Sequence, residues 1–120
     1  MIIDFVEFVE EHSELTFYPN AFPLDNSIEA AGICKITPMS PLKAGVATIE
    51  LQLIVRATHP ETAEKYAIDL RKALSDHTAF TVGEIRVIHL TVPNPIPNYI
   101  GKDENNRYKY SINCRVMIQI

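Results

Sequence analysis

Apolar and polar residues alternate in two stretches of the chain, at 46–57 and at 107–120. A period of two places successive side chains on opposite faces of a β-strand, so each stretch predicts a strand. The second stretch is far longer than the common strand length of about 5–6 residues, which predicts a strand that spans the sheet or projects beyond it. The apolar face of the first stretch comprises Ala47, Ile49, Leu51, Leu53, Val55 and Ala57.

Two other stretches repeat with the helical period of about 3.6 residues. Residues 2–13 carry an apolar stripe on one side and acidic residues on the other, which predicts an amphipathic helix. A second helix is predicted where either Thr58 and Glu61 form a capping box or His59 caps a helix that begins at Pro60. Its apolar stripe comprises Ala63, Tyr66, Ala67, Leu70, Ala73 and Leu74. Ile68 lies nearly opposite this stripe, either as an ordinary exposed side chain or as a subunit contact.

Three weaker β-prone runs, at 15–19, 29–37 and 84–92, complete the predicted elements. The order of elements predicts one domain over residues 1–120 of the α+β class, with a mostly antiparallel sheet of four to five strands and two helices packed on one face. The opposite face of the sheet is expected to be polar and to meet water or a polar partner. Its predicted side chains are Thr48, Glu50, Gln52, Arg56, Lys109, Ser111 and Asn113.

The charge balance argues against one class of partner. The 120 residues include 11 Lys and Arg against 15 Asp and Glu, a net charge of −4, whereas a nucleic-acid surface needs a basic footprint. Apolar runs stay far below the roughly 20 residues of a membrane span, and the acidic N-terminal segment is unlike a secretory signal. Two cysteines without a disulfide framework are typical of a protein made in a reducing cytoplasm.

The cysteines, histidines and acidic residues do not show the spacing of a known catalytic or metal-binding motif. Cys34 and Cys114 lie within predicted strands and are expected to be buried, inert thiols. The histidines lack zinc-ligand spacing, and His89, in an apolar strand, is expected in the core. The acidic run at 103–106 lacks the order of an EF-hand loop. We therefore expect no catalytic residue, no metal site and no cofactor.

Long connections at 19–28, 38–45 and 93–106 are the unusual feature of the chain. Loops above about 12 residues are usually functional or disordered in compact domains, and proline lowers the entropy cost of holding a loop in one pose. The stretch "PNPIPNYIGKDENN" at 93–106 joins two predicted antiparallel neighbours, and it predicts a stiff docking loop anchored by Tyr99 and Ile100. The predicted contact residues for a neighbouring subunit or partner are Met39, Leu42, Ile68, Arg71, Tyr99, Ile100, Asp103 and Glu104.

The whole chain resembles the small minor capsid and tail-terminator proteins of long-tailed bacteriophages. The resemblance lies in the N-terminal helix, in the strand "ATIELQLIVRA" running directly into "THPETAEKYAIDLRKAL", and in the closing segment "PNYIGKDENNRYKYSINCRVMI". In the closing segment, a proline-rich approach precedes G-x-D-E and a long strand with alternating polar residues.

The resemblance implies a non-enzymatic virion protein whose α+β subunits close into a homohexameric ring. Such a ring caps the finished tail tube, ends its polymerisation and joins the tail to the head connector. The implied partners are further copies of the chain, the tail tube protein and the connector or neck proteins, and DNA would pass through the lumen without sequence-specific binding. The implied location is the tail–head junction of the virion, reached from the host cytoplasm during assembly, with no membrane involved.

Two other functions stay open. One is a head-side neck protein, such as an adaptor or stopper, which belongs to the same structural class. The other is a small-ligand-binding α+β domain or enzyme that would use a cleft near His89 and the loop at 93–106. Against the second stands the lack of any converging set of acid, base or metal ligands.

Overall fold

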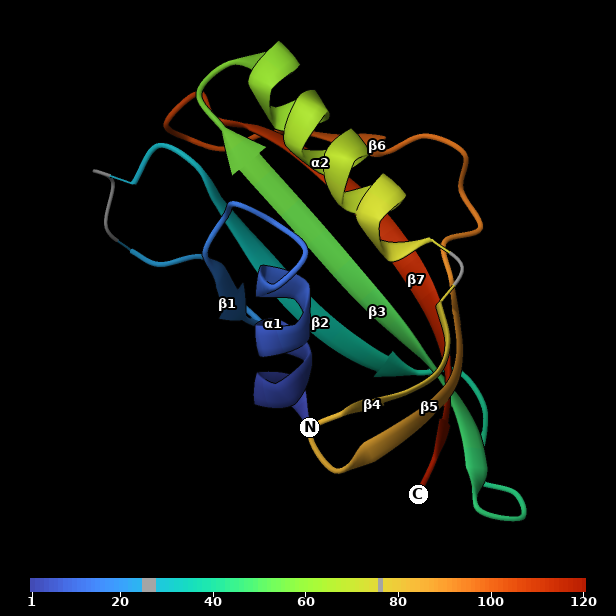
Figure 1. Cartoon of the computed structure of the whole chain (residues 1–120). Helices are drawn as coiled ribbons and strands as arrows, with labels where there is room; N and C mark the ends of the chain where they lie inside the picture. The colour runs from blue at the N-terminus through green and yellow to red at the C-terminus, as the bar shows by residue number, and fades with distance from the viewer. Residues whose placement is uncertain (25–27, 76) are drawn as a thin grey trace.

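One mixed sheet organises the chain. The structure is a computed structural model that describes residues 1–24, 28–75 and 77–120. Within these residues the sheet has seven strands in the order β1-β2-β3-β7-β5-β4, with β6 pairing separately with β7 (Figure 1). The elements are α1 (Ile2–Glu10), β1 (Phe17–Pro19), β2 (Ala31–Pro38), β3 (Val46–Ala57), α2 (Pro60–Leu74), β4 (His77–Val82), β5 (Ile85–Thr91), β6 (Asn98–Lys102) and β7 (Tyr108–Gln119).

The two alternating stretches of the sequence form the centre of the sheet. β3 and β7 each have 12 residues and pair antiparallel over their full length, from Val46 opposite Gln119 to Ala57 opposite Tyr108. The prediction of a strand at 46–57 is confirmed with the same bounds, and the long closing strand is confirmed as β7. This pairing puts the apolar side chains of both strands on one face, because residues directly opposite each other share a face.

The α+β class and the mostly antiparallel sheet are confirmed, but the expected count of four to five strands is too low. The missed strands are β4 and β6. Half of the residues of β4 are exposed, so the strand lacks an apolar alternation, and a positive φ angle at Ala79 (52°) interrupts it. β6 lies inside the segment predicted as a loop at 93–106, so this segment is a loop only in part.

The two helices cover different parts of the sheet. α1 contacts β1, β2 and β4, whereas α2 contacts β3 and β7, and Figure 1 shows both helices in front of the sheet. His59 is the residue before α2 and Pro60 begins the helix, so the second of the two predicted starts is confirmed. α1 ends at Glu10, before the predicted end at residue 13, and the His12 ring lies 2.9 Å from the carbonyl oxygen of Phe8.

A single hydrophobic core lies between the helices and the sheet, and it includes residues of α1, α2 and most strands. Cys34 and Cys114 are buried in this core as predicted. Burial raises the pKa of each thiol to about 12, so both thiols stay protonated near neutral pH. His89 contradicts its prediction, because it is exposed in β5 rather than buried in the core.

Candidate functional site

Two groups of exposed apolar side chains lie at opposite ends of the molecule. The protein is elongated, with extents of 46 × 28 × 23 Å. Figure 1 shows the β2–β3 connection and the C-terminus at one end, and β6 with the segment before β7 at the other. We call these the Met39 end and the Tyr99 end. Twelve extended residues span about 36 Å, so β3 and β7 hold the two ends a fixed distance apart.

The Met39 end is a short ordered turn that presents apolar side chains. Met39 and Leu42 are exposed, Leu42 by 59%. The backbone N–H of Thr48 donates to the Oγ of Ser40 (2.9 Å), and the N–H of Ile120 donates to the carbonyl of Gly45 (2.9 Å). These bonds tie the turn to the final residue of the chain. The two predicted contact residues at this end are therefore held in place rather than left on a loose loop.

At the Tyr99 end, strand β6 displays Tyr99 and Ile100. Tyr99 is 53% exposed, and its ring packs against that of Tyr110 with centroids 5.4 Å apart. The pairing of β6 with β7 shifts register between Tyr99 and Gly101, which marks Ile100 as the bulged residue. Gly101 adopts a φ of 103°, a conformation that favours glycine. The predicted anchors thus stand on a strand with a bulge, not on a proline-stiffened loop.

Ile68 and Arg71 of α2 differ in their surroundings from the other predicted contact residues. Ile68 is half-buried rather than fully exposed. The Nε of Arg71 donates to the carbonyl of Asn94 at 2.6 Å, which ties α2 to the segment that precedes β6. Arg71 therefore has a role inside the subunit, and the subunit contacts of both residues stay predictions.

The two acidic residues after β6 point in different directions. Glu104 is exposed, whereas Asp103 turns toward the protein. Asp103 Oδ1 accepts the backbone N–H groups of Asn105 and Arg107, both at 2.9 Å. Asp103 Oδ2 accepts the Nε of Arg107 at 2.9 Å. Burial alone would raise the pKa of Asp103, but these hydrogen bonds and the charge of Arg107 lower it below the usual value.

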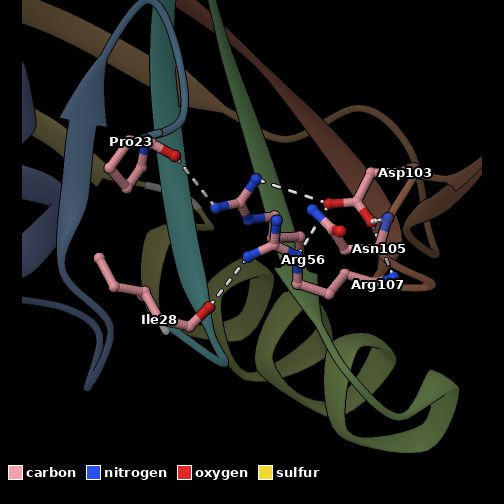
Figure 2. Close-up of polar contacts among 6 residues, drawn as sticks. All are labelled: Pro23, Ile28, Arg56, Asp103, Asn105 and Arg107. Atoms are coloured by element: carbon pink, nitrogen blue, oxygen red, sulfur yellow. Dashed lines mark hydrogen bonds and ion pairs between the residues drawn. The ribbon is translucent and has the colours of Figure 1, made fainter. Parts of the chain in front are cut away.

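Asp103 belongs to a cluster that sequence patterns did not reveal. Figure 2 shows Arg56 and Arg107 between Asp103 on one side and the backbone of Pro23 and Ile28 on the other. Arg107 Nη1 donates to the carbonyl of Ile28 (3.1 Å) and Arg56 Nη2 to that of Pro23 (3.5 Å). Both arginines are buried, with exposures of 5% for Arg56 and 4% for Arg107.

The polar face of the sheet is therefore covered where Arg56 lies. The ring of Phe22 stacks against the guanidinium, with the Arg56 Cζ 4.1 Å from the ring centroid. The face was predicted to meet water or a polar partner; Arg56 and Ser111 do not meet water, because both are buried. Alternation in β3 placed Arg56 on the correct face, but the covering residues come from the segment before β2, far away in the sequence.

A groove between the helices is a second feature that the sequence did not reveal. Two adjoining cavities, of about 370 and 320 Å³, share Glu14 and Tyr66 in their walls. The rest of the groove is lined mainly by the turn after α1 and by α2, and acidic residues dominate it. These acidic residues are Glu11, Glu14, Glu61 and Asp69, beside the single cation Lys65.

Neither a metal-binding group of side chains nor a membrane-spanning helix occurs in the part of the chain that the structure describes. Over residues 1–24, 28–75 and 77–120, no group of three or more His, Cys, Asp and Glu side chains is placed to hold a metal ion. Within the same ranges, no helix is both long and apolar enough to cross a membrane. The features described above are two apolar ends, an acidic groove and a buried arginine pair.

These features define a small α+β protein in which two groups of exposed apolar side chains, Met39 with Leu42 and Tyr99 with Ile100, lie near opposite ends of a continuous strand pair. A family model described as bacteriophage tail terminator protein matches residues 30–120, which include β2 and every later element. The chain belongs to the bacteriophage tail terminator family, which confirms the resemblance seen in the sequence. Comparison with curated proteins found no match.

Membership of this family implies a structural role in the phage tail and contact with other tail components. It also implies a component of the virion and a role other than catalysis. The matched residues hold β2 to β7 with α2, and they include both apolar ends. α1 and β1 lie outside the match.

Proposed function

We propose that the protein forms a ring, six-fold in the expected case, that caps the phage tail tube, ends its polymerisation and joins the tail to the head connector. The role is structural, and the ring would sit at the tail–head junction of the virion. Family membership supports the terminator role over that of a head-side adaptor or stopper. One geometric observation supports the ring: the apolar contact residues form two different surfaces at opposite ends of one rigid strand pair.

A ring needs two such surfaces. In a closed cyclic assembly above a dimer, each subunit meets its two neighbours through different patches, whereas a two-fold dimer uses one patch twice. The Met39 end presents Met39 and Leu42, and the Tyr99 end presents Tyr99 and Ile100. The long β3–β7 pairing holds the two surfaces at a fixed separation, which is what a ring of defined size requires.

The net charge fits a lumen through which DNA passes without being bound. Phosphate groups bind to clusters of Lys and Arg, and the chain carries 15 acidic against 11 basic residues. Two of the basic residues, Arg56 and Arg107, are buried away from the surface. The acid excess would keep the duplex mobile inside the ring.

A ligand-binding or enzymatic function has less support. His89, near which this alternative would place its cleft, is exposed and lines neither the two cavities between the helices, nor the cavity beside Arg56, nor the cavity at the β2–β3 connection. The two largest acidic cavities are open and lack a buried acid–base pair. These observations favour a protein that acts by contact with other proteins.

The test uses one substitution at each end of the molecule. Leu42→Asp disrupts the Met39 end and Ile100→Asp disrupts the Tyr99 end, and neither side chain is part of the core. Single substitutions change the apolar surface alone. Deleting residues 97–104 would also remove Asp103 from its contacts with Arg56 and Arg107. Thr81→Asp, on the exposed part of β4, is the matched control for added charge.

Each end variant alone should fail to form rings, but a mixture of the two should give a one-to-one complex. The intact Met39 end of one variant would then bind the intact Tyr99 end of the other. Native mass spectrometry gives the stoichiometry, and electron microscopy with assembled tail tubes shows whether rings sit at tube ends. Normal rings from either variant, or no complex in the mixture while the wild type forms rings, would contradict the two-surface arrangement.

A further inference from the structure

Exposed apolar side chains form a row across the face of the sheet that points away from the helices. Met117 of β7 alternates with the fully buried Val116 and Ile118, so its side chain points away from the core. Met117 lies opposite Thr48 of β3, and the backbone N–H of Met39 donates to the carbonyl of Thr48 at 3.0 Å. Because residues opposite each other share a face, Met39, Thr48 and Met117 follow one another across the sheet.

A bulge in β5 extends this row by two residues. The pairing of β5 with β7 shifts register between Val87 and His89, so Ile88 and His89 together face Met117. Val87 and Leu90 on either side are fully buried, whereas Ile88 and His89 are both exposed. Without the bulge, one of these two side chains would point into the core. We give the name methionine row to the three exposed apolar residues Met39, Met117 and Ile88, with exposures of 46%, 40% and 37%.

Tyrosines gather at the other end of the sheet, on the face that the helices cover. Tyr99 of β6 pairs with Tyr110 of β7, and their ring centroids are 5.4 Å apart. The ring centroid of Tyr108 lies 6.4 Å from that of Tyr99. Tyr110 is opposite the buried Val55 of β3, which assigns the three rings to the core side of the sheet. We call these three residues the tyrosine cluster.

The methionine row and the tyrosine cluster differ in both face and position. Tyr110 and Met117 both belong to β7, and their separation in the sequence corresponds to about 23 Å along the strand. One copy can therefore lay its tyrosine cluster on the methionine row of the next copy, with the two sheets overlapping only at their ends. Such a contact joins two unlike surfaces, and its repetition in one direction leads to a ring or a filament rather than to a two-fold dimer.

We propose that the methionine row is the docking surface for the tyrosine cluster of a second copy of the chain. The proposal rests on the ring proposed above, and it extends the Met39 end onto the face of the sheet. The chemistry of the two surfaces fits this pairing, because thioether sulfur makes favourable contacts with aromatic rings and tyrosine often anchors interfaces. A flexible methionine side chain also adapts to the shape of its partner.

Exposed charges beside the methionine row are mainly basic. Arg86 is exposed in β5, and Lys43 is exposed in the β2–β3 connection. Against these two cations stands Glu84, which is exposed in the turn before β5. Arg115 and Glu50 lie opposite each other in β7 and β3, so their charges offset each other.

Exposed charges beside the tyrosine cluster are mainly acidic. Burial raises the pKa of Tyr110, and the charge of the adjacent, exposed Glu64 raises it further. Glu104 is exposed in the turn after β6, and the Nζ of Lys102 lies 5.5 Å from the ring centroid of Tyr108. Contact between the two unlike surfaces would bring basic residues to acidic ones, whereas two methionine rows face to face would bring basic residues together. The charges therefore favour the tyrosine cluster as the occupant.

The first experiment identifies the surfaces that meet. His89→Cys places a thiol opposite Met117, and Lys102→Cys places one opposite Tyr108, while the methionine row and the tyrosine cluster stay intact. The native cysteines are buried, and their raised pKa of about 12 keeps them unreactive. We expect a short bismaleimide to join the two variants into a mixed dimer after assembly, with tail tubes present where assembly needs them, as measured by mass spectrometry. Glu7→Cys, on the exposed side of α1, is the control and should give no product with either variant.

The second experiment measures the contribution of the methionine row. Met117→Gln keeps the length of the side chain and replaces its apolar end, and the position is exposed, so the core is unchanged. We expect this variant to weaken subunit association by about tenfold in analytical ultracentrifugation. Ile3→Gln, which removes a similarly exposed apolar side chain from α1, should associate as the wild type does.

The outcomes separate this pairing from the ring itself. A mixed dimer together with weakened association of Met117→Gln supports the pairing. Cross-linking of two His89→Cys chains to each other would mean that two methionine rows meet, which overturns it. Rings that form without a mixed dimer overturn the pairing and leave the ring standing. Normal rings of Met117→Gln that no longer bind tail tubes would make the tube protein the occupant in place of a second copy. A wild type that stays monomeric even with tail tubes overturns the ring and the pairing together.

Discussion

Replacing Asp103 by Asn tests whether a single carboxylate holds the buried arginine pair. An amide oxygen can still accept the backbone N–H groups of Asn105 and Arg107, which Asp103 Oδ1 accepts at 2.9 Å. The other oxygen faces the Nε of Arg107 at 2.9 Å and the Nη1 of Arg56 at 3.6 Å. An amide nitrogen at that position would turn its own N–H groups toward two donors. The substitution therefore preserves the turn and removes the charge.

The expected loss of stability follows from the contacts that the substitution breaks. A hydrogen bond to a charged group contributes about 1.5–3 kcal/mol, and breaking a fully buried ion pair costs about 3–5 kcal/mol. The side chain of Asp103 is 18% exposed, so water compensates part of the loss. We expect Asp103→Asn to lower the free energy of unfolding by about 2–3 kcal/mol at neutral pH.

The effect should depend on pH in a defined direction. The pKa of Asp103 is lowered in the folded state, so its contribution is fully present above the unfolded value of about 3.9. It is lost as the pH falls through the lower folded value, because the protonated acid no longer compensates the arginines. The stability difference between wild type and Asp103→Asn should therefore shrink at acid pH.

Urea unfolding followed by circular dichroism measures this difference at about pH 7 and about pH 3. The matched control is Glu104→Gln, which removes a charge from the neighbouring exposed residue and should change stability by less than about 0.5 kcal/mol. A loss for Asp103→Asn that is the same at both pH values would refute the charge argument. A loss no larger than that of the control would refute the role of Asp103 itself.

Three further predictions concern the fold. Gly32→Ala should lower stability by about 1–3 kcal/mol in a urea titration, because its Cβ would overlap the ring of Phe17; an unchanged midpoint would contradict that packing. Cys34 and Cys114 should react with a thiol reagent only at the rate of unfolding, because burial raises each pKa to about 12; fast labelling of the native protein would contradict this. Arg71→Gln should speed amide hydrogen exchange in the segment before β6, because it removes the 2.6 Å hydrogen bond to Asn94, and unchanged exchange would show that the bond does not order this segment.

The strands at the centre of the sheet were predictable because only one of their faces lies in the core. Successive side chains of a strand point to opposite faces, so apolar and polar residues alternate along the sequence. β3 shows this clearly, and its bounds matched the prediction. β4 and β6 were not predictable in the same way, because half of the residues of β4 and most of those of β6 are exposed, so no alternation is required of them. Among the described strands β6 pairs with β7 alone, and its bulge at Ile100 interrupts even the short pattern that five residues could show.

Exposed apolar side chains were predictable only where such a side chain stands in a polar segment. Met39, Leu42, Tyr99 and Ile100 meet that condition, and the structure shows all of them exposed. Their roles in assembly stay predictions. Asp103 also stood in the predicted group, but its contacts lie within the subunit and link it to Arg107 and Arg56.

Arg56 shows why the buried arginine cluster escaped a reading of the sequence. Alternation assigns a side chain to one face of a sheet, and Arg56 was assigned to the face away from the helices. The alternation does not reveal which residues cover that face. Here Phe22 and Pro23 cover it, more than thirty positions earlier in the sequence. A central strand is packed on one face and paired at both edges, so long-range loops decide which of its remaining positions are free. In this protein the loop before β2 covers Arg56, near the end of β3 that pairs with the start of β7.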